Sequence, residues 1–355
     1  MRLGPIVEST LRKDLLKMRK KLITVLTCII LVPLILLTVL CIYHQIRLKK
    51  ELSIIHHTMG QFVEVDGHNM NVYTEGSGDK TLVFLAGFGT PSPVLDFKPL
   101  YSRLTDKDRI VVIEKFGYGY SDEFEGDRSV DTIVDQNRAA LASLGIDGPY
   151  ILVPHSAGGI EAIWWAEHYP DEVEAIIGLD SNVPSQYANY RTPQDLNVLE
   201  PQDVDECISS MAVNDFFMYK IGLFRLMMPP SSMPALVCEE LTADEREQYS
   251  ALGYTMYCRG SGSTFMRESI MTSHALECLR EYVNTPVPDI PTLFFVSDGS
   301  VMSQLMDADT WISIHEDYIN GLTDGVIIYL DCGHYVHVEM PDEVASGIET
   351  FVDSL

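Results

Sequence analysis

The feature that most constrains this chain is an uncharged apolar stretch near its N-terminus. Between Lys21 and His44 lie 22 residues without a charged side chain, Leu22–Tyr43. As a helix they extend about 33 Å, close to the ~30 Å hydrocarbon core of a bilayer. A cleaved signal peptide is the alternative, but its apolar stretch usually has only about 7–15 residues and ends at a small-residue site, which Tyr43–Arg47 does not offer. We therefore expect an uncleaved, single-pass membrane anchor.

The charges divide the chain into two parts. Residues 1–50 hold ten of the 25 Lys and Arg side chains and only two of the 51 Asp and Glu side chains. Seven of the ten basic groups precede the apolar stretch, so the positive-inside rule predicts a cytoplasmic N-terminus and an extracytoplasmic body. The acidic body lacks the basic face that binding to phosphates requires, and we expect no nucleic-acid partner. Membrane lipid is the partner that the N-terminal helix predicts.

The distribution of charged and apolar residues predicts four consecutive parts of the chain. Apolar residues make up 46% of the chain, enough for a substantial core. The expected parts are a basic tail, the anchor, a linker and one large domain, at residues 1–21, 22–43, 44–59 and 60–355.

Strands alternate with helices in the large domain. A turn at Asp66–Asn69 between two short β patterns predicts an opening hairpin, Gln61–Val65 with Met70–Thr74. Short apolar runs predict buried strands, and helically spaced segments separate them. The strands are expected at Thr81–Leu85, Ile110–Ile113, Tyr150–Val153, Ala175–Leu179, Thr292–Val296 and Val326–Leu330, and the helices at Val130–Leu144, Ile160–His168 and Glu343–Val352. This order is typical of an α/β fold with a mostly parallel sheet covered on both faces.

One long segment lacks a strand pattern. Residues 183–288 contain eight of the fifteen methionines, and the apolar run Phe216–Met228 is interrupted by Lys220 and Arg225. A second membrane span is therefore disfavoured, and we expect a helical cap over one end of the sheet. Clustered methionines can be ordinary core residues or can line an adaptable apolar pocket.

Ser156 is the candidate nucleophile. The strand Tyr150–Val153 runs into Pro154-His155-Ser156-Ala157-Gly158, and a helix follows at once. A serine on such a sharp turn has its hydroxyl exposed, and the helix N-terminus behind it favours negative charge. Proline stands where glycine is usual at the first small position. The alternative is a serine that only caps the helix.

A serine nucleophile needs a base and an orienting acid. His334 follows the last strand on a loop with Gly333 and is the candidate base, with His337 as its competitor. Asp298, just after Thr292–Val296, is the favoured acid. Asp180, just after Ala175–Leu179, is the alternative acid.

Two backbone N–H groups are expected to form an oxyanion hole. One is that of Ala157, directly after the serine. The other is that of Phe88, between Gly87 and Gly89 in the loop after Thr81–Leu85. A plain glycine turn is the alternative interpretation of that loop. No motif for a metal or cofactor is present, and none is expected.

These residues, in this order, resemble the α/β-hydrolase superfamily, in its lid-bearing esterase- or lipase-like branch. The resemblance includes Gly117-Tyr118-Gly119-Tyr120-Ser121-Asp122 and Cys332-Gly333-His334-Tyr335, and runs from about Gly60 to the C-terminus. It implies an α/β-hydrolase fold and a serine hydrolase. Haloalkane dehalogenases and epoxide hydrolases of this fold use an aspartate nucleophile, where this chain has Ser156.

Three functions remain open from the sequence. The first is a membrane-anchored hydrolase of small or lipid-like carboxylic esters. The second is a peptidase that releases an N-terminal residue and holds the substrate amine with a cap carboxylate, for which Glu206, Glu239 and Glu240 are candidates. The third is a non-catalytic sensor that binds a small ligand.

Overall fold

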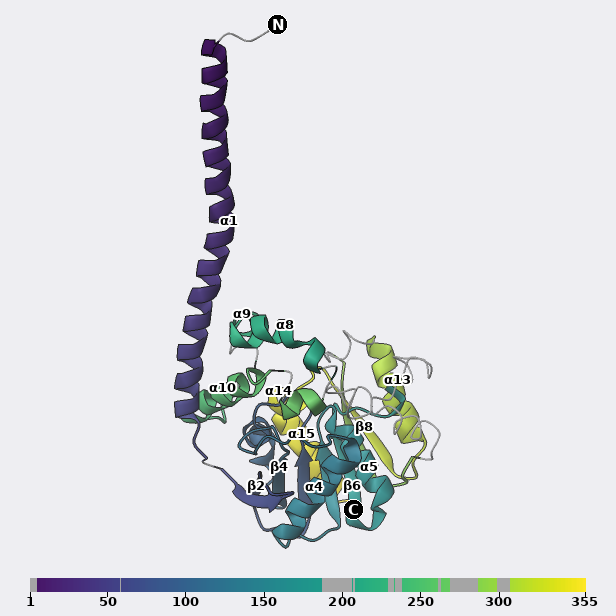
Figure 1. The fold of residues 1–355 in the computed structure, drawn as a ribbon. Coiled ribbons are helices and arrows are strands. Elements are labelled where there is room, and N and C mark those ends of the chain that lie inside the picture. Colours follow the sequence, from purple (N-terminus) through teal and green to yellow (C-terminus); the bar gives the residue numbers. More distant parts are fainter. Residues whose placement is uncertain are drawn as a thin grey trace.

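A long N-terminal helix projects from a body in which one β-sheet lies between layers of helices (Figure 1). The computed structural model describes residues 5–57, 59–186, 206, 208–228, 233, 238–260, 263–268, 287–298 and 307–355. Parts of the predicted cap, residues 183–288, lie outside these ranges.

The sheet has eight strands in the order β1-β2-β4-β3-β5-β6-β7-β8. They are β1 (Gln61–Val65), β2 (His68–Glu75), β3 (Thr81–Leu85), β4 (Arg109–Glu114), β5 (Tyr150–Pro154), β6 (Val173–Leu179), β7 (Thr292–Ser297) and β8 (Gly325–Leu330). β2 pairs antiparallel with β1 and β4 at one edge, and all other neighbours are parallel. The predicted mostly parallel sheet with an antiparallel edge hairpin is confirmed. Every residue of β3 and β5 is buried, which explains their uninterrupted apolar sequences.

Helices cover both faces of the sheet and form two apolar layers. One layer contains α4 (Val130–Ser143), α5 (Gly158–His168) and α13 (Ala308–Asn320), and its largest buried side chains are Trp165 and Trp311. The other contains α2 (Pro93–Asp96), α3 (Lys98–Tyr101), α14 (Val336–Glu339) and α15 (Pro341–Val352). The parallel strands therefore end at one common rim, between the two layers, where loops can meet.

The cap lies between β6 and β7, and its described elements are helical as predicted. They are α8 (Ala212–Asp215), the π-helical turn η2 (Phe216–Lys220), α9 (Phe224–Met227) and α10 (Ala243–Tyr257). α10 begins with a capping box, in which Thr242 and Glu245 each accept the backbone N–H of the other. We call these residues, with 263–268, the cap.

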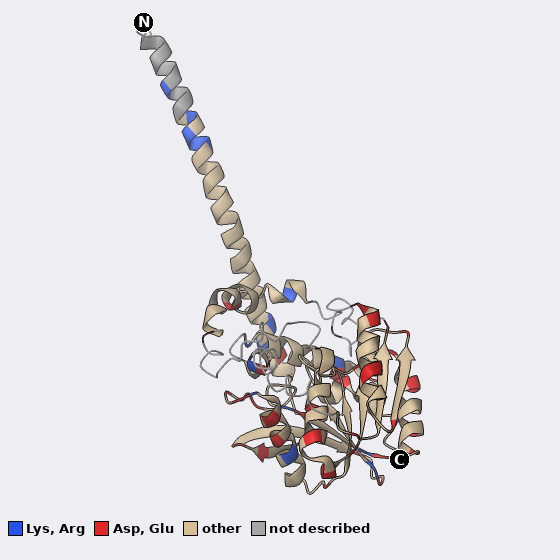
Figure 2. Cartoon of the chain, turned by 90° about the vertical axis from the view of Figure 1, so that its right-hand side faces the viewer, with Lys and Arg blue, Asp and Glu red and all other residues tan. Residues whose placement is uncertain are grey.

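The N-terminal helix α1 (Pro5–Ile54) is continuous and, from Leu16, long and apolar enough to cross a membrane. Figure 2 shows Lys and Arg near its N-terminal end, then an uncharged stretch, with Asp and Glu spread over the body. Within the predicted linker, residues 44–59, the chain continues α1 as far as Ile54. These helical residues pack against α10, and Glu51 pairs with Arg225 of the cap, which stabilises this end of the helix.

Candidate active site

Ser156 lies on a strained turn between β5 and α5. Its φ is +50°, in the left-handed region that residues with a side chain seldom adopt. Its carbonyl oxygen accepts hydrogen bonds from the N–H groups of Gly159 and Asn182, at 2.9 and 2.8 Å. A Cβ on Gly158 would lie only 2.6 Å from the carbonyl oxygen of Leu85, so the helix can return this close to the strand only with glycine. This is the strand–turn–helix geometry of a nucleophile elbow.

The imidazole of His334 is bound to a buried carboxylate. His334 Nδ1 lies 2.6 Å from Oδ2 of Asp180, which is completely buried. The other oxygen, Oδ1, accepts hydrogen bonds from the backbone N–H of Ser297 and the indole N–H of Trp311, each at 2.9 Å. Because a carboxylate accepts hydrogen bonds, the imidazole proton belongs on Nδ1, which makes Nε2 the basic nitrogen.

The structure places Asp180, the alternative acid, beside His334 in place of Asp298, the acid that the sequence favoured. The side chain of Asp298 is exposed at the end of β7, and its backbone N–H bonds to Leu330. Asp180 directly follows β6, the strand next to β5, in a left-handed turn with φ +44°. Asn182, two residues later, donates to the carbonyl oxygen of Ser156, so the turn with the acid and the turn with the serine are bonded together.

The two predicted oxyanion donors flank the serine. Gly87 packs so closely against the turn that a Cβ on it would lie 2.7 Å from Cβ of Ser156. Phe88 follows Gly87, and Ala157 follows Ser156. Within the described part of the chain, neither the Phe88 nor the Ala157 amide donates a hydrogen bond to another residue. Such amides suit the negative oxygen of a tetrahedral intermediate.

The loop that carries Phe88 is held by two tyrosines. The N–H of Gly89 donates to the hydroxyl of Tyr118 at 3.3 Å, and the hydroxyl of Tyr257 donates to the carbonyl of Gly89 at 2.6 Å. The Phe88 ring stacks on Phe265, with centroids 4.5 Å apart. Tyr257 and Phe265 belong to the cap, so the cap directly supports the loop with the predicted oxyanion donor Phe88.

His155 and His337 have other partners. His155 Nε2 donates to the carbonyl of His334 at 3.1 Å, which supports the loop that carries the base. Burial, followed by the nearby His334 and His337, lowers the pKa of His155 well below its usual value, so its ring is neutral. His337 is completely buried, and its Nε2 lies 2.9 Å from Oδ2 of Asp96. His337, the competitor of His334, therefore forms a separate buried pair.

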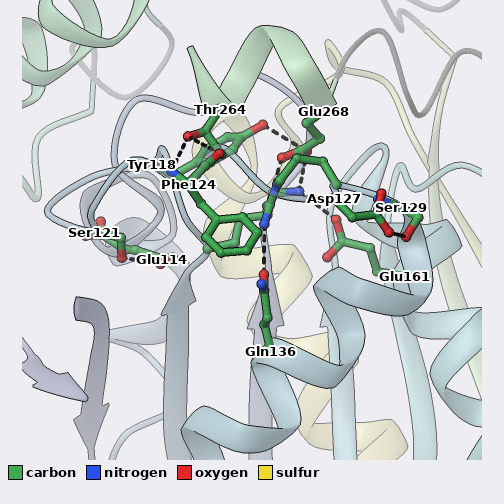
Figure 3. A network of polar contacts seen from close by, with 12 residues as sticks. Glu114, Tyr118, Ser121, Phe124, Asp127, Ser129, Gln136, Glu161, Thr264 and Glu268 are labelled. Carbon is green, nitrogen blue, oxygen red and sulfur yellow. Dashed lines mark hydrogen bonds and ion pairs between the residues drawn. The ribbon is translucent and has the colours of Figure 1, made fainter. Parts of the chain in front are cut away.

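A buried network of charges connects the end of β4 with α5 and the cap (Figure 3). The ammonium group of Lys115, directly after β4, lies 2.6 Å from Glu161 of α5 and 2.7 Å from Glu268 of the cap. Arg128 also contacts Glu268, at 3.4 Å, and donates to Gln136 of α4 at 2.8 Å. Burial opposes the charge of Lys115, but the two carboxylates outweigh it and raise the pKa of its ammonium group. Two cations and two anions thus compensate one another between sheet, helix and cap.

The network reaches the oxyanion loop through one hydroxyl. Tyr118 donates to Glu268 at 3.0 Å and accepts from the N–H of Gly89. Glu268 therefore holds Tyr118 in place, and Tyr118 in turn holds Gly89, the residue after Phe88. The sequence offered no signal for this network, because its members are far apart in the chain.

The cap carboxylates proposed for binding a substrate amine lie in other environments. Glu240 pairs with Arg103 at 2.9 Å, and Arg103 also contacts Asp342. Glu239 and Glu206 are exposed. None of these three groups contacts the residues around Ser156 within the described ranges.

Comparison with known proteins agrees with this geometry. Residues 80–205 match a family profile described as alpha/beta hydrolase fold. The uncharacterized protein YbdG of Bacillus subtilis is 34% identical over 308 residues, which cover 85% of this chain and 88% of that protein. This chain belongs to the α/β-hydrolase family. A 2-(acetamidomethylene)succinate hydrolase of Mesorhizobium japonicum is 30% identical over 124 residues, 35% of this chain and 43% of that protein.

Solved structures show the same fold. A laboratory-evolved variant of potato epoxide hydrolase StEH1 has a TM-score of 0.60 at 19% identity, and the match covers 83% of this chain and 99% of that one. At this identity the likeness establishes the fold alone. Membership of the α/β-hydrolase family, shown by the sequence relatives, supports a hydrolase that acts on a small molecule.

Helix α13 holds the acid in place and was not predicted. It begins at Ala308, after the N-cap residue Asp307, whose side chain accepts the N–H of Thr310. Trp311, Ile314 and Tyr318 lie on its buried face. Two sequence signals could have predicted this helix: the N-cap aspartate and the apolar residues spaced three and four positions apart. Trp311 gives this helix its role in the site, since its indole binds Asp180.

Two asparagine variants distinguish the two acids. Asp180→Asn is expected to slow the reaction of the chain with a fluorophosphonate by about 10³-fold or more, because an amide no longer holds the Nδ1–H tautomer of His334. Asp298→Asn is the matched control and is expected to react at the wild-type rate. The measurement is the second-order rate of labelling, and a larger loss in Asp298→Asn would contradict the assignment.

Removing one cation from the buried network is expected to destabilise the protein. Lys115→Met leaves Glu161 and Glu268 without their shared cation and should lower the free energy of unfolding by about 3–5 kcal/mol. Chemical unfolding of the detergent-solubilised chain measures this. Lys107→Met is the control, because Lys107 pairs with Glu349 at the exposed surface and should leave the unfolding midpoint nearly unchanged. Equal midpoints for both variants would show that the network contributes little.

Proposed function

We propose that the protein is a membrane-anchored serine hydrolase that cleaves carboxylic esters. The observation that carries this proposal is the 2.6 Å hydrogen bond from His334 to the buried Asp180, on a turn bonded to the strained elbow of Ser156. A nucleophile, a base and an orienting acid are then present in the chain order serine, acid, histidine.

The first half of the reaction forms an acyl-enzyme. Ser156 Oγ attacks the ester carbonyl carbon while His334 Nε2 takes the hydroxyl proton. The carbonyl π electrons move to oxygen, and the amides of Phe88 and Ala157 hold the resulting oxyanion. The C–O bond to the alcohol then breaks, and His334 returns the proton to the leaving alkoxide.

The second half releases the acid. Water attacks the acyl carbon, His334 takes a proton from that water, and a second tetrahedral intermediate forms in the same oxyanion hole. When the bond to Ser156 breaks, the proton passes to its oxygen and the free enzyme is restored. Asp180 accepts the hydrogen bond from the Nδ1–H group of His334 throughout and compensates the charge of the imidazolium in both halves.

An apolar acyl group fits the surroundings of the oxyanion loop. The exposed ring of Phe88 stacks on Phe265, which packs with Tyr118 and Met256 in a small apolar cluster. The potato structural neighbour is an epoxide hydrolase by name. The nucleophile position of this chain, however, holds serine and not the aspartate of epoxide hydrolases, which favours an acyl-enzyme route.

Ester hydrolysis should depend on one serine. Ser156→Ala is expected to lower the turnover of p-nitrophenyl butyrate by about 10³-fold or more, because the nucleophile is lost. Ser102→Ala, at a surface turn after α3, is the control and should keep full turnover. Undiminished ester turnover in Ser156→Ala would refute the proposal. Faster turnover of an aminoacyl p-nitroanilide than of the ester would favour the peptidase instead.

We further propose that the body is extracytoplasmic. The basic residues before the apolar part of α1 support this orientation. A protease added outside sealed, right-side-out vesicles should then degrade the body, and detergent should not be required. Protection of the body until detergent is added would place it in the cytoplasm.

A further inference from the structure

The cap is fixed to the C-terminal part of α1 by one buried arginine. Arg225 of α9 donates from Nε to Nδ1 of His44 at 2.9 Å and forms two hydrogen bonds with the carboxylate of Glu51. Its guanidinium group also lies over the ring of Tyr254 in α10, 4.2 Å from the centroid. His44, Glu51 and Arg225 are all buried. A buried, bidentate pair of this kind holds both partners in one orientation.

The backbone of the cap also contacts α1 where the uncharged stretch ends. The carbonyl oxygen of Lys220 accepts from the amide of Gln45 at 3.4 Å and from the thiol of Cys41 at 3.7 Å. Gly222 has φ +92°, and a Cβ on it would lie 2.6 Å from Cβ of His44, so the two backbones approach closely. The turn between η2 and α9 is therefore level with the last residues of Leu22–Tyr43.

Large apolar side chains are exposed at this level. Phe216 of η2 is 53% exposed, and Leu226 and Met227 of α9 are 66% and 67% exposed. Val213 and Phe217 are exposed beside them. Figure 1 shows α8 and α9 on the side of the body from which α1 projects. We call these five residues the apolar cap surface.

We propose that the apolar cap surface is a second membrane-contact site, which lies in the interfacial layer of the bilayer that α1 spans. The proposal rests on the membrane anchoring proposed above. Its side chains would be buried among the upper acyl chains and headgroups, as in interfacial amphipathic segments. Lys220, the last residue of η2, is exposed and would extend its ammonium group toward lipid phosphates.

Continuity with the anchor favours lipid over another occupant. Lys220 and Gly222 attach the apolar cap surface to α1 at the end of its apolar stretch. A membrane around Leu22–Tyr43 therefore reaches this surface without any movement of the cap. A water-soluble protein seldom exposes this many large apolar side chains together. A second copy of the chain is the competing occupant, and the experiment below distinguishes it.

Tryptophan fluorescence in lipid vesicles tests the proposal. Phe216→Trp and Leu226→Trp are placed, as full-length chains, in phosphatidylcholine vesicles with or without bromine on the acyl chains, which quenches nearby indoles. Phe62→Trp is the matched control, because Phe62 is 47% exposed on β1, beyond the far end of α1. The native Trp164, Trp165 and Trp311 give every variant the same background.

We expect brominated lipid to reduce the added emission of Phe216→Trp and Leu226→Trp and to leave that of Phe62→Trp unchanged. Equal, weak quenching in all three variants would overturn the proposal. Emission that changes with the protein-to-lipid ratio but is not quenched by brominated lipid would also overturn the proposal. That result would indicate that a second copy of the chain covers the surface.

Alkaline extraction of the same vesicles separates the two proposals. A chain that stays in the membrane but shows no quenching contradicts only the second contact site. A chain that is extracted contradicts the anchoring itself, and the contact site with it. Ester turnover of each variant, measured beside wild type, reports whether the proposed enzyme is still folded.

Discussion

The site depends on the placement of one buried carboxylate. Asp180 is sealed beneath the rim of the sheet, with two N–H donors on one oxygen and His334 on the other. A buried carboxylate is costly unless its lone pairs are satisfied, so Ser297 and Trp311 are as necessary as the acid itself. This arrangement sets the orientation of His334, and it leaves Nε2 of the imidazole as the nitrogen that can act as a base. Helix α13 and strand β7 thus contribute to the site by holding Asp180.

Buried charged groups bind the cap to the body and to α1, beside the apolar contacts that the cap makes with the body. Lys115 and Arg128 connect it to the sheet and to α4, while Arg225 connects it to α1. Burying such groups costs desolvation, and hydrophobic replacements can be equally stable, so their value lies in fixing one geometry. In this chain that geometry supports the loop of Phe88 through Tyr118 and holds the cap beside the C-terminal part of α1. Helix α1, the cap and the candidate site are therefore connected by one series of side-chain contacts.

Much of this arrangement could be predicted from local sequence. Uninterrupted apolar runs identify the buried strands, and Ser156 and His334 stand where strands give way to short turns. The acid could not be predicted in the same way, because Asp180 and Asp298 both follow buried strands that end at the same rim. Only tertiary contacts distinguish them, since the indole of Trp311 reaches Asp180 while Asp298 faces solvent. The buried charge network could not be predicted either, because its members are distant in sequence and only tertiary contacts bring them together.

The central claim is that Asp180, His334 and Ser156 act as one catalytic unit, and peptide mapping after phosphonylation tests it most directly. The full chain is treated with a fluorophosphonate in detergent, digested and analysed by mass spectrometry. The account predicts a single phosphonyl group, on the peptide that contains Ser156, and its loss when His334 is replaced by alanine. An adduct on another serine, or no adduct on folded protein, would contradict the account.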